Sequence, residues 1–391
     1  MTTVDVIDAG FDPDRLRRVG ESLQADIDSG HYDGGAVAVG RGAGLVSLDV
    51  AGWADRAEER PMVEDQLVIP FSVSKQFINV AILGFVERGL IGLAQPVAEV
   101  IPEFGQRGKD RIQIWHLLTH TGGVFSGIPP FGPEDLIRYE KWTEYVCGAL
   151  PETPEPGRQV IYSLLGGHAV LSSILVAADP QKRSLDQILR DEILQPVGMV
   201  NTTLGPPEDP SQVAPVVTRY NAPAGIFHEA EVAGIGGLVL APGSQIPGGG
   251  FVTTIGDLWR FADTLRRGGV SADGHRIIAP ATLDLVTKNL TGDAPNTMFN
   301  YAVSQRHLLP WPAAVGLGFF VRGTAINPGP LPNLGSERTY GGWGSGSSLF
   351  WVDPDRDVSF AMVTTGALED TDHIRRSQKL SDIVLSALVG E

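Results

Sequence analysis

Ser72-Val73-Ser74-Lys75 is the most informative stretch of this chain, and it opens an apolar helical pattern. Apolar residues recur after it at the three- and four-residue spacing of a helix until Gly89: Phe77, Ile78, Ala81, Ile82 and Phe85. A serine and a lysine three residues apart on a helix face the same way. The lysine can then exchange a proton with the serine oxygen. The free N–H groups at the start of the helix can stabilise the negative charge that develops on an oxyanion.

The same four residues also fit an ordinary helix start, with a capping serine and a solvated lysine. Two observations weigh against this reading. Of the six lysines, only Lys75 has a serine three residues before it, and its neighbours are apolar. An activated serine nucleophile is therefore the sharper hypothesis for Ser72.

The composition indicates a folded protein with a large core. The 391 residues are 42% hydrophobic and 19% charged, which is enough for two structural lobes. The net charge of −16 disfavours nucleic acid and anionic membrane surfaces as partners. A small molecule is the expected partner, and the sequence does not indicate an oligomeric state.

The N-terminal residues, the apolar stretches and the cysteine content bear on the cellular compartment. The N-terminal residues carry neither a basic region nor an apolar region of a secretion signal, and no apolar stretch approaches the ~20 residues of a membrane helix. A single cysteine, Cys147, excludes an intramolecular disulfide. We expect a cytoplasmic protein.

The spacing of apolar residues and the positions of turn residues predict an α/β (α+β) fold, with an antiparallel sheet flanked by helices and an inserted, mainly helical lobe. Residues 1–90 and 240–391 would form the sheet domain, and residues 91–239, rich in Pro and Gly between short helical patterns, the inserted lobe. A hairpin is expected at 36–39 and 45–50 and helices at 255–267 and 373–389. Further strands are expected at 314–322, 347–353 and 357–365.

A lysine base requires help, because its ordinary pKa of about 10.4 keeps it protonated at neutral pH. Tyr162 follows a Pro-Gly turn and precedes an apolar helix. A phenolate held beside an ammonium group could accept the serine proton, although a core tyrosine fits the same pattern. The glycine-rich run 340–346 could bring a backbone N–H close to a ligand, or could be a flexible loop.

These residues together resemble the serine β-lactamase and penicillin-binding-protein superfamily, and within it the class C-like family VIII esterases and related acyltransferases, over nearly the whole chain. Ser72-Val73-Ser74-Lys75 matches the Ser-x-x-Lys motif. Four further blocks follow in the family's order. Residues 112–123 resemble the family's HLLTHTSG stretch, and residues 156–163 resemble its block in which PG is followed by YSN. Residues 247–258 resemble its block in which PAGG is followed by ST and DL, and residues 340–346 with the turn at 351–354 resemble its last motif strand.

The resemblance implies roles for individual residues. Ser72 would attack a carbonyl carbon, and Lys75 with Tyr162 would accept and relay the proton. The backbone N–H groups of Ser72 and Ser345 would bind the oxyanion. Residues Gly342, Trp343 and Gly344 would contact the substrate.

Two departures from the family bear on the substrate. Leu164 stands where β-lactamases carry an amide, and Gly342-Trp343-Gly344 stands where they carry Lys-Thr-Gly. Trp343 could instead fill the first motif position, as in esterases that read Trp-Gly-Gly, but the cation is absent in either register. Each loss costs a polar contact of roughly 1 to 3 kcal/mol. We expect Trp343 to form a flat apolar wall beside the oxyanion strand.

Cofactor motifs are absent from the sequence. His116 and His120 lie four apart, as zinc ligands on a helix do, but the Glu of His-Glu-x-x-His is missing and the family's histidines here are structural. No Gly-x-Ser-x-Gly, Gly-x-Gly-x-x-Gly or P-loop occurs. We expect neither a metal nor a cofactor.

The sequence therefore predicts a serine carboxylesterase of β-lactamase-like type that acts through an acyl-enzyme on Ser72. An acyltransferase that passes the acyl group to an alcohol or amine is the first alternative. An amidase, β-lactamase or D,D-peptidase is the second, and a binding or scaffold protein is the non-enzymatic one. Three loops would shape the pocket: 125–133, 227–231 and 298–311.

Overall fold

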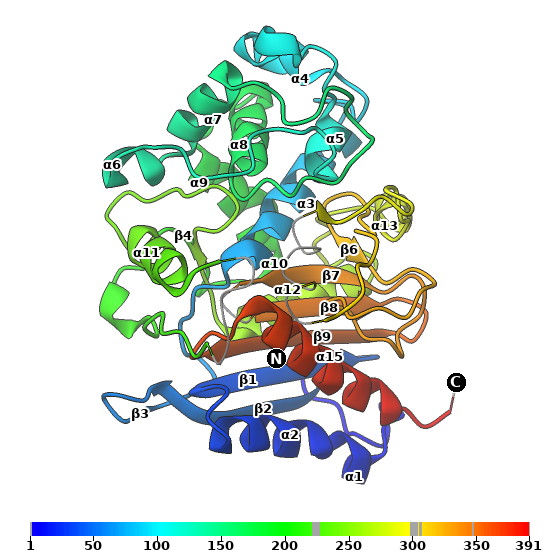
Figure 1. Ribbon diagram of the computed structural model, residues 1–391. Coiled ribbons are helices and arrows are strands. Elements are labelled where there is room, and N and C mark those ends of the chain that lie inside the picture. The colour runs from blue at the N-terminus through cyan, green and yellow to red at the C-terminus, as the bar shows by residue number, and fades with distance from the viewer. Residues whose placement is uncertain (1, 221–226, 298–303, 305–306, 346–347, 391) are drawn as a thin grey trace.

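The computed structural model describes residues 2–220, 227–297, 304, 307–345 and 348–390 (Figure 1). Gly346, the last residue of the glycine-rich motif, and much of the 298–311 loop lie outside these ranges. Among the described residues, the helices are too short or too polar to cross a bilayer.

A seven-stranded sheet pairs strands from the two ends of the chain, in the order β3-β2-β1-β9-β8-β7-β6 (Figure 1). Every neighbouring pair is antiparallel, which confirms the predicted fold class. The strands are β1 Gly34–Arg41, β2 Gly44–Asp55, β3 Arg60–Pro61, β6 Phe320–Val321, β7 Tyr340–Gly344, β8 Ser348–Asp353 and β9 Val358–Thr365. Strands β4 Thr203–Leu204 and β5 Phe251–Val252 form a separate pair.

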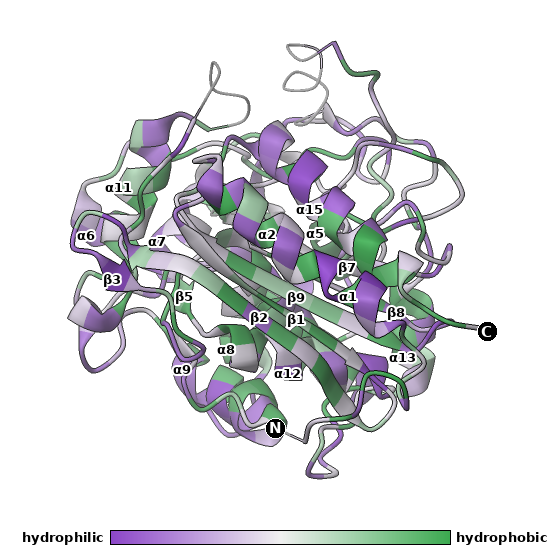
Figure 2. Ribbon diagram, turned by 90° about the horizontal axis from the view of Figure 1, so that it is seen from below, coloured by the Kyte–Doolittle hydropathy of each residue, from purple (hydrophilic) through white to green (hydrophobic). Residues whose placement is uncertain are grey.

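The two faces of the sheet contribute to different cores, because successive side chains of a strand point to opposite faces. Val39 of β1 and Met362 of β9 pack with helices α2 (Arg18–Asp28) and α15 (Asp370–Ser386). Ala38 and Ala361 instead join the larger core with α3 (Ser74–Glu87) and α12 (Ile255–Arg266). In Figure 2, α2 and α15 carry both purple and green residues, as expected of helices with one buried face.

The chain between α3 and α12 consists of short helices and the loops that join them, and several of these helices lie above the sheet in Figure 1. The remaining helices are α1 Pro13–Leu16, α4 Val97–Val100, α5 Ile114–Leu118, α6 Pro133–Leu136, α7 Tyr139–Gly148, α8 Gly166–Ala178, α9 Leu185–Leu189, α10 Gln195–Val197, α11 Glu229–Val239 and α13 Pro280–Val286. The domain boundaries at 90/91 and 239/240 stay predictions.

One predicted strand is largely wrong. The apolar run 314–322 forms only the two-residue strand β6. Gly318 has a φ of +79° and Ala314 a φ of +47°, both of which break an extended backbone. The carbonyl of Gly318 instead accepts hydrogen bonds from Gln76 (3.1 Å) and Asn79 (2.8 Å) of α3. This segment therefore supports α3 and extends the sheet very little.

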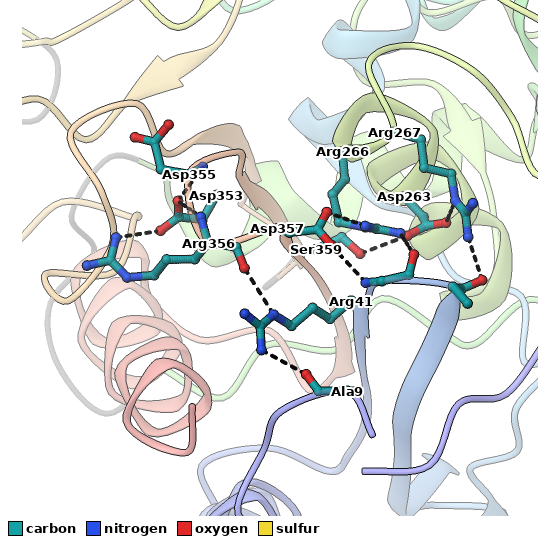
Figure 3. A network of polar contacts seen from close by, with 12 residues as sticks. Ala9, Arg41, Asp263, Arg266, Arg267, Asp353, Asp355, Arg356, Asp357 and Ser359 are labelled. Carbon is teal, nitrogen blue, oxygen red and sulfur yellow. Dashed lines mark hydrogen bonds and ion pairs between the residues drawn. The ribbon is translucent and has the colours of Figure 1, made fainter. Parts of the chain in front are cut away.

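A polar network fixes the end of the sheet opposite Ser345 (Figure 3). Arg266, at the end of α12, pairs with Asp263 (2.8 Å) and with Asp357 of the β8–β9 turn, and it donates to the carbonyl of Gly42 in the β1–β2 turn. Arg41 donates to the backbone of that β8–β9 turn. The network holds two hairpins and a helix together, so the sheet is a firm base for the site at its other end.

Candidate active site

Ser72 and Lys75 lie together where the chain enters α3. Ser72 belongs to a 3₁₀ turn, Phe71–Val73, that runs directly into the helix, and Lys75 lies in the first helical turn. The Lys75 Nζ atom is 3.0 Å from Ser72 Oγ and donates to the carbonyl of Gly248 at 2.9 Å. The spacing of three residues thus produces the contact that the sequence suggests.

Burial makes the ammonium group of Lys75 a stronger acid than that of an ordinary lysine. Its side chain is 2% exposed, and desolvation lowers its pKa from about 10.5 to about 7. A substantial fraction of Lys75 is therefore uncharged at neutral pH. An uncharged amine 3.0 Å from a serine hydroxyl is able to accept its proton.

Tyr162 lies beside Lys75, but its protonation state differs from the predicted one. The Lys75 Nζ atom is 5.1 Å from the centre of the Tyr162 ring. Burial raises the pKa of Tyr162 above its ordinary value, even though a hydrogen bond with Ser72 opposes this. The interpretation of Tyr162 as a phenolate is wrong, because the phenol stays protonated at neutral pH. Tyr162 is placed to donate a hydrogen bond or to pass on a proton, and Lys75 is the candidate base.

Two histidines pack behind this pair, the half-buried His120 and the fully buried His168. The His120 ring stacks on Tyr162, with ring centres 4.3 Å apart, and its Nδ1 accepts the N–H of Ser163 at 3.2 Å. His168 Nε2 lies 3.0 Å from Asn79 Oδ1. Burial lowers the pKa of His120 to about 3 and that of His168 well below its usual range. Both rings are therefore neutral and act as packing and hydrogen-bonding groups.

His116 has a local role. Its Nδ1 accepts the N–H of Gln113 at 3.0 Å, which fixes the start of α5. Burial lowers the pKa of His116 to about 4. His116 thus serves the backbone of its own helix, whereas His120 serves the site.

Gly248 is required at its position by close packing. Its φ is +68°, and a Cβ there would lie 2.9 Å from His168 and 3.0 Å from the Lys75 side chain. Any other residue would push Lys75 away from the carbonyl that holds it. The motif 247–258 of the sequence therefore contributes to the site through its backbone.

Strand β7 ends beside the backbone of Ser72. A Cβ on Gly344 would lie 2.2 Å from the Pro70 carbonyl oxygen and 3.2 Å from the Ser72 nitrogen, so only glycine allows this approach. Ser345 follows directly and lines the same pocket as Ser72. The amides of Ser72 and Ser345 are thus neighbours, which is the arrangement that an oxyanion hole needs.

Gly342 leaves room for α3. A Cβ on Gly342 would lie 2.3 Å from Gln76 Oε1, so Gln76 fills the space that a longer side chain of residue 342 would need. A cation cannot be accommodated there without moving Gln76.

Trp343 does not form a wall of the site, and that expectation is wrong. Its side chain is 4% exposed and belongs to the core beneath α15, where it stacks with His373 at 6.2 Å between ring centres. Strand alternation explains the difference. Gly342 faces α3 and Gly344 faces the turn that leads into it, so Trp343 must face the other way.

A buried carboxyl group beside Ser345 was not predicted. Asp370 is 1% exposed at the start of α15, and neither carboxyl oxygen has a partner with hydrogen-bond geometry among the described residues. Burial, with Glu369 beside it, raises the pKa of Asp370 well above its usual range, although the nearby Ser345 side chain opposes this. Asp370 in turn raises the pKa of Tyr162. In the sequence, Glu369-Asp370 resembles an ordinary helix start, so no signal singled it out.

A small pocket, with a cavity volume of about 30 Å³, opens at Ser72 and Ser345. Leu164, the residue that replaces the family's amide, is part of its wall, as are Ile128 and Phe227 from two of the three loops expected to shape the pocket. Among the described residues, the lining includes no lysine, arginine or histidine. The site therefore presents a nucleophile to an apolar, uncharged space.

Known proteins resemble this chain along most of its length. The beta-lactamase family matches residues 19–384. "Esterase/beta-lactamase LipL" of Mycobacterium tuberculosis (strain ATCC 25618 / H37Rv) is 27% identical over 368 residues, which cover 88% of this chain and 80% of that protein.

Two solved structures share the fold. One is a family VIII carboxylesterase, with a TM-score of 0.76 and 18% identity over 94% of this chain and 98% of that one. The other is EstCE1, described as a hydrolase with promiscuous acyltransferase activity, with a TM-score of 0.73 and 23% identity over 95% of this chain and 99% of that one. At these identities the likeness shows the fold alone.

Proposed function

The chain belongs to the beta-lactamase family, and from that premise we propose that it is a serine hydrolase that cleaves carboxylic esters through an acyl-enzyme on Ser72. The observation that carries the proposal is the 3.0 Å contact between Ser72 Oγ and the Nζ atom of buried Lys75. The apolar pocket beside Ser72 supports an ester as the substrate, because the part of its lining that the structure describes offers no cation to pair with a carboxylate.

The proposed reaction begins when Ser72 Oγ attacks the ester carbonyl carbon and its proton passes to the uncharged Lys75. The amides of Ser72 and Ser345 stabilise the oxyanion. The carbon–oxygen bond to the alcohol then breaks, and the alcohol leaves with the proton returned from Lys75 through the Tyr162 hydroxyl. Water attacks the acyl-Ser72 ester by the same route and releases the acid.

A β-lactam or a peptide ending in a carboxylate fits this site poorly. Gln76 fills the space beside Gly342, and the described residues that line the pocket include no lysine, arginine or histidine. A carboxylate bound there would gain no opposite charge. Because these contacts are lost, we expect a chromogenic cephalosporin to be turned over at least about 10²-fold more slowly than an activated ester.

Formation of the acyl-enzyme is the direct test. When the protein is mixed with p-nitrophenyl butanoate and quenched in acid, we expect the intact mass to increase by one butanoyl group, with the label on the peptide that contains Ser72. Turnover without label on that peptide, or label elsewhere, would contradict the proposal.

The pH dependence tests the assignment of Lys75 as the base. Lys75 accepts a proton only when uncharged, so kcat/KM for a neutral ester should rise with pH through an apparent pKa of about 7 and then level. The rate is measured by p-nitrophenol release after subtraction of spontaneous hydrolysis. A rise centred near the ordinary lysine pKa, about 10.4, would show that burial does not activate Lys75.

Acyl transfer is a second candidate. The pocket at Ser72 is apolar, which disfavours water and favours an organic acceptor, and the fold is shared with EstCE1, a hydrolase with promiscuous acyltransferase activity. Adding a competing alcohol to the assay distinguishes the two reactions, since a transferase would produce the new ester in place of the free acid.

A further inference from the structure

A second apolar pocket adjoins the one at Ser72. It has a cavity volume of about 170 Å³ and shares three lining residues with the first: Ile128, Leu165 and Ile235. These three side chains therefore stand where one pocket meets the other. The second pocket extends from them between α6, α7 and α11, away from the nucleophile.

The walls of the second pocket are almost entirely apolar. Leu136 and Trp142 line one side, and Ile235 and Leu238 of α11 line the other. The only polar atom of the Trp142 ring donates to the Leu136 carbonyl at 2.8 Å, so the ring offers carbon atoms to the space. Ile128, at the junction, is left 41% exposed. A polar ligand would lose its hydration here without gaining partners.

The polar groups of the two pockets lie at opposite ends. Ser72 and Ser345 stand at the reactive end of the first pocket. Glu231 belongs to the lining of the second, and its carboxylate accepts the N–H of His228 at 2.8 Å at the exposed start of α11. Between these ends the lining is apolar, which suits an unbranched hydrocarbon with its reactive group at Ser72.

We infer that the two pockets form one channel for a long aliphatic chain, so that the ester cleaved by this protein carries such a chain on its acyl or its alcohol side. The inference rests on the proposed esterase activity and names its substrate class. Each methylene moved from water into an apolar pocket is worth about fourfold in binding, so chain length should control kcat/KM strongly.

Gly234 offers a way to block only the far pocket. It lines that pocket on α11 and does not line the first one, and a Cβ on it meets no atom within 4 Å. Gly234→Leu would fill the far space without a backbone clash. Gly237→Leu is the matched control, because Gly237 lies on the same helix with equally open space and lines neither pocket.

The experiment compares p-nitrophenyl acetate, butanoate, octanoate and decanoate on the three proteins, together with acetates of short and long alcohols. In the wild type and Gly237→Leu, we expect kcat/KM to rise at least tenfold from butanoate to decanoate, or along the alcohol series if the chain is on that side. In Gly234→Leu the rise should disappear while the acetate and butanoate rates stay unchanged. Equal rates along both series in the wild type would overturn the inference but leave the proposed esterase activity intact.

A binding measurement decides the inference even if no ester is turned over. Calorimetry on the folded Ser72→Ala protein compares 1-decanol with 1-butanol. We expect decanol to bind at least tenfold more tightly, and the addition of Gly234→Leu, but not of Gly237→Leu, to remove the difference. Equal affinity for the two alcohols, or an equal effect of both glycine substitutions, would show that there is no channel.

Discussion

Ser72→Ala is expected to lower the hydrolysis of p-nitrophenyl butanoate by roughly 10⁴-fold or more, to the level of the remaining oxyanion and binding groups. The nucleophilic oxygen disappears, and no other hydroxyl on a lining residue except that of Ser345 faces the pocket among the described residues. The protein should remain folded. Lys75 keeps its hydrogen bond to the Gly248 carbonyl, and the loss of one hydrogen bond costs about 1 kcal/mol.

Ser74→Ala is the control for local damage. Ser74 is fully buried two residues away, and its hydroxyl accepts a long hydrogen bond of 3.4 Å from the Phe251 amide. Its loss should leave most of the activity. If Ser72→Ala is folded by circular dichroism and retains the wild-type rate, Ser72 is not the nucleophile. If both variants lose activity equally, the loss reflects the start of α3 and not the chemistry of Ser72.

The part of the site that the sequence predicted depends on short-range geometry. A spacing of three residues on a helix fixes Ser72 beside Lys75 wherever that helix packs. The hairpins of the sheet were predictable for the same reason, since β1 and β2 are joined by a short turn. The burial of Lys75 could also be anticipated, because its neighbours in the sequence are apolar.

The remaining features depend on contacts between distant segments. Trp343 stands between glycines, which carry no apolar or polar signal, so the sequence does not show which face of the sheet it joins. Asp370 lies 298 positions from Ser72 and resembles a helix start. The phenolate state assigned to Tyr162 failed because local sequence does not show how strongly a residue is desolvated. In each case packing, which no local pattern records, decided the outcome.

Replacing Lys75 with Met should reduce activity and raise stability together. Loss of the general base should lower kcat/KM by about 10³- to 10⁴-fold. Stability should rise because burial of the amine, which lowers its pKa from about 10.5 to about 7, costs the wild-type folded state free energy that a Met side chain does not cost. Below its unfolded pKa, the lysine binds more protons in the unfolded chain than in the folded one, so wild-type stability should rise with pH between about 7 and 10.

The net gain from Lys75→Met at pH 7 is smaller than this pKa shift implies. Met is similar in length and apolar, but it leaves the Gly248 carbonyl without its hydrogen bond at a cost of about 1 to 3 kcal/mol. We expect a net stabilisation of roughly 2 kcal/mol, together with loss of the stability increase between about pH 7 and 10. Urea denaturation at several pH values measures both effects.

Lys109 provides the matched control for this substitution, because it is the other lysine among the described residues that is buried (1% exposed). It donates to the carbonyls of Cys147 and Ala149 at the end of α7 and lines neither pocket. Lys109→Met should keep the esterase activity and lose stability, since two carbonyls lose their donor. A Lys75→Met protein that is less stable than the wild type at pH 7 would show that the lysine contributes to folding. The proposal that burial of the reactive Lys75 amine lowers the stability of the protein would then be wrong.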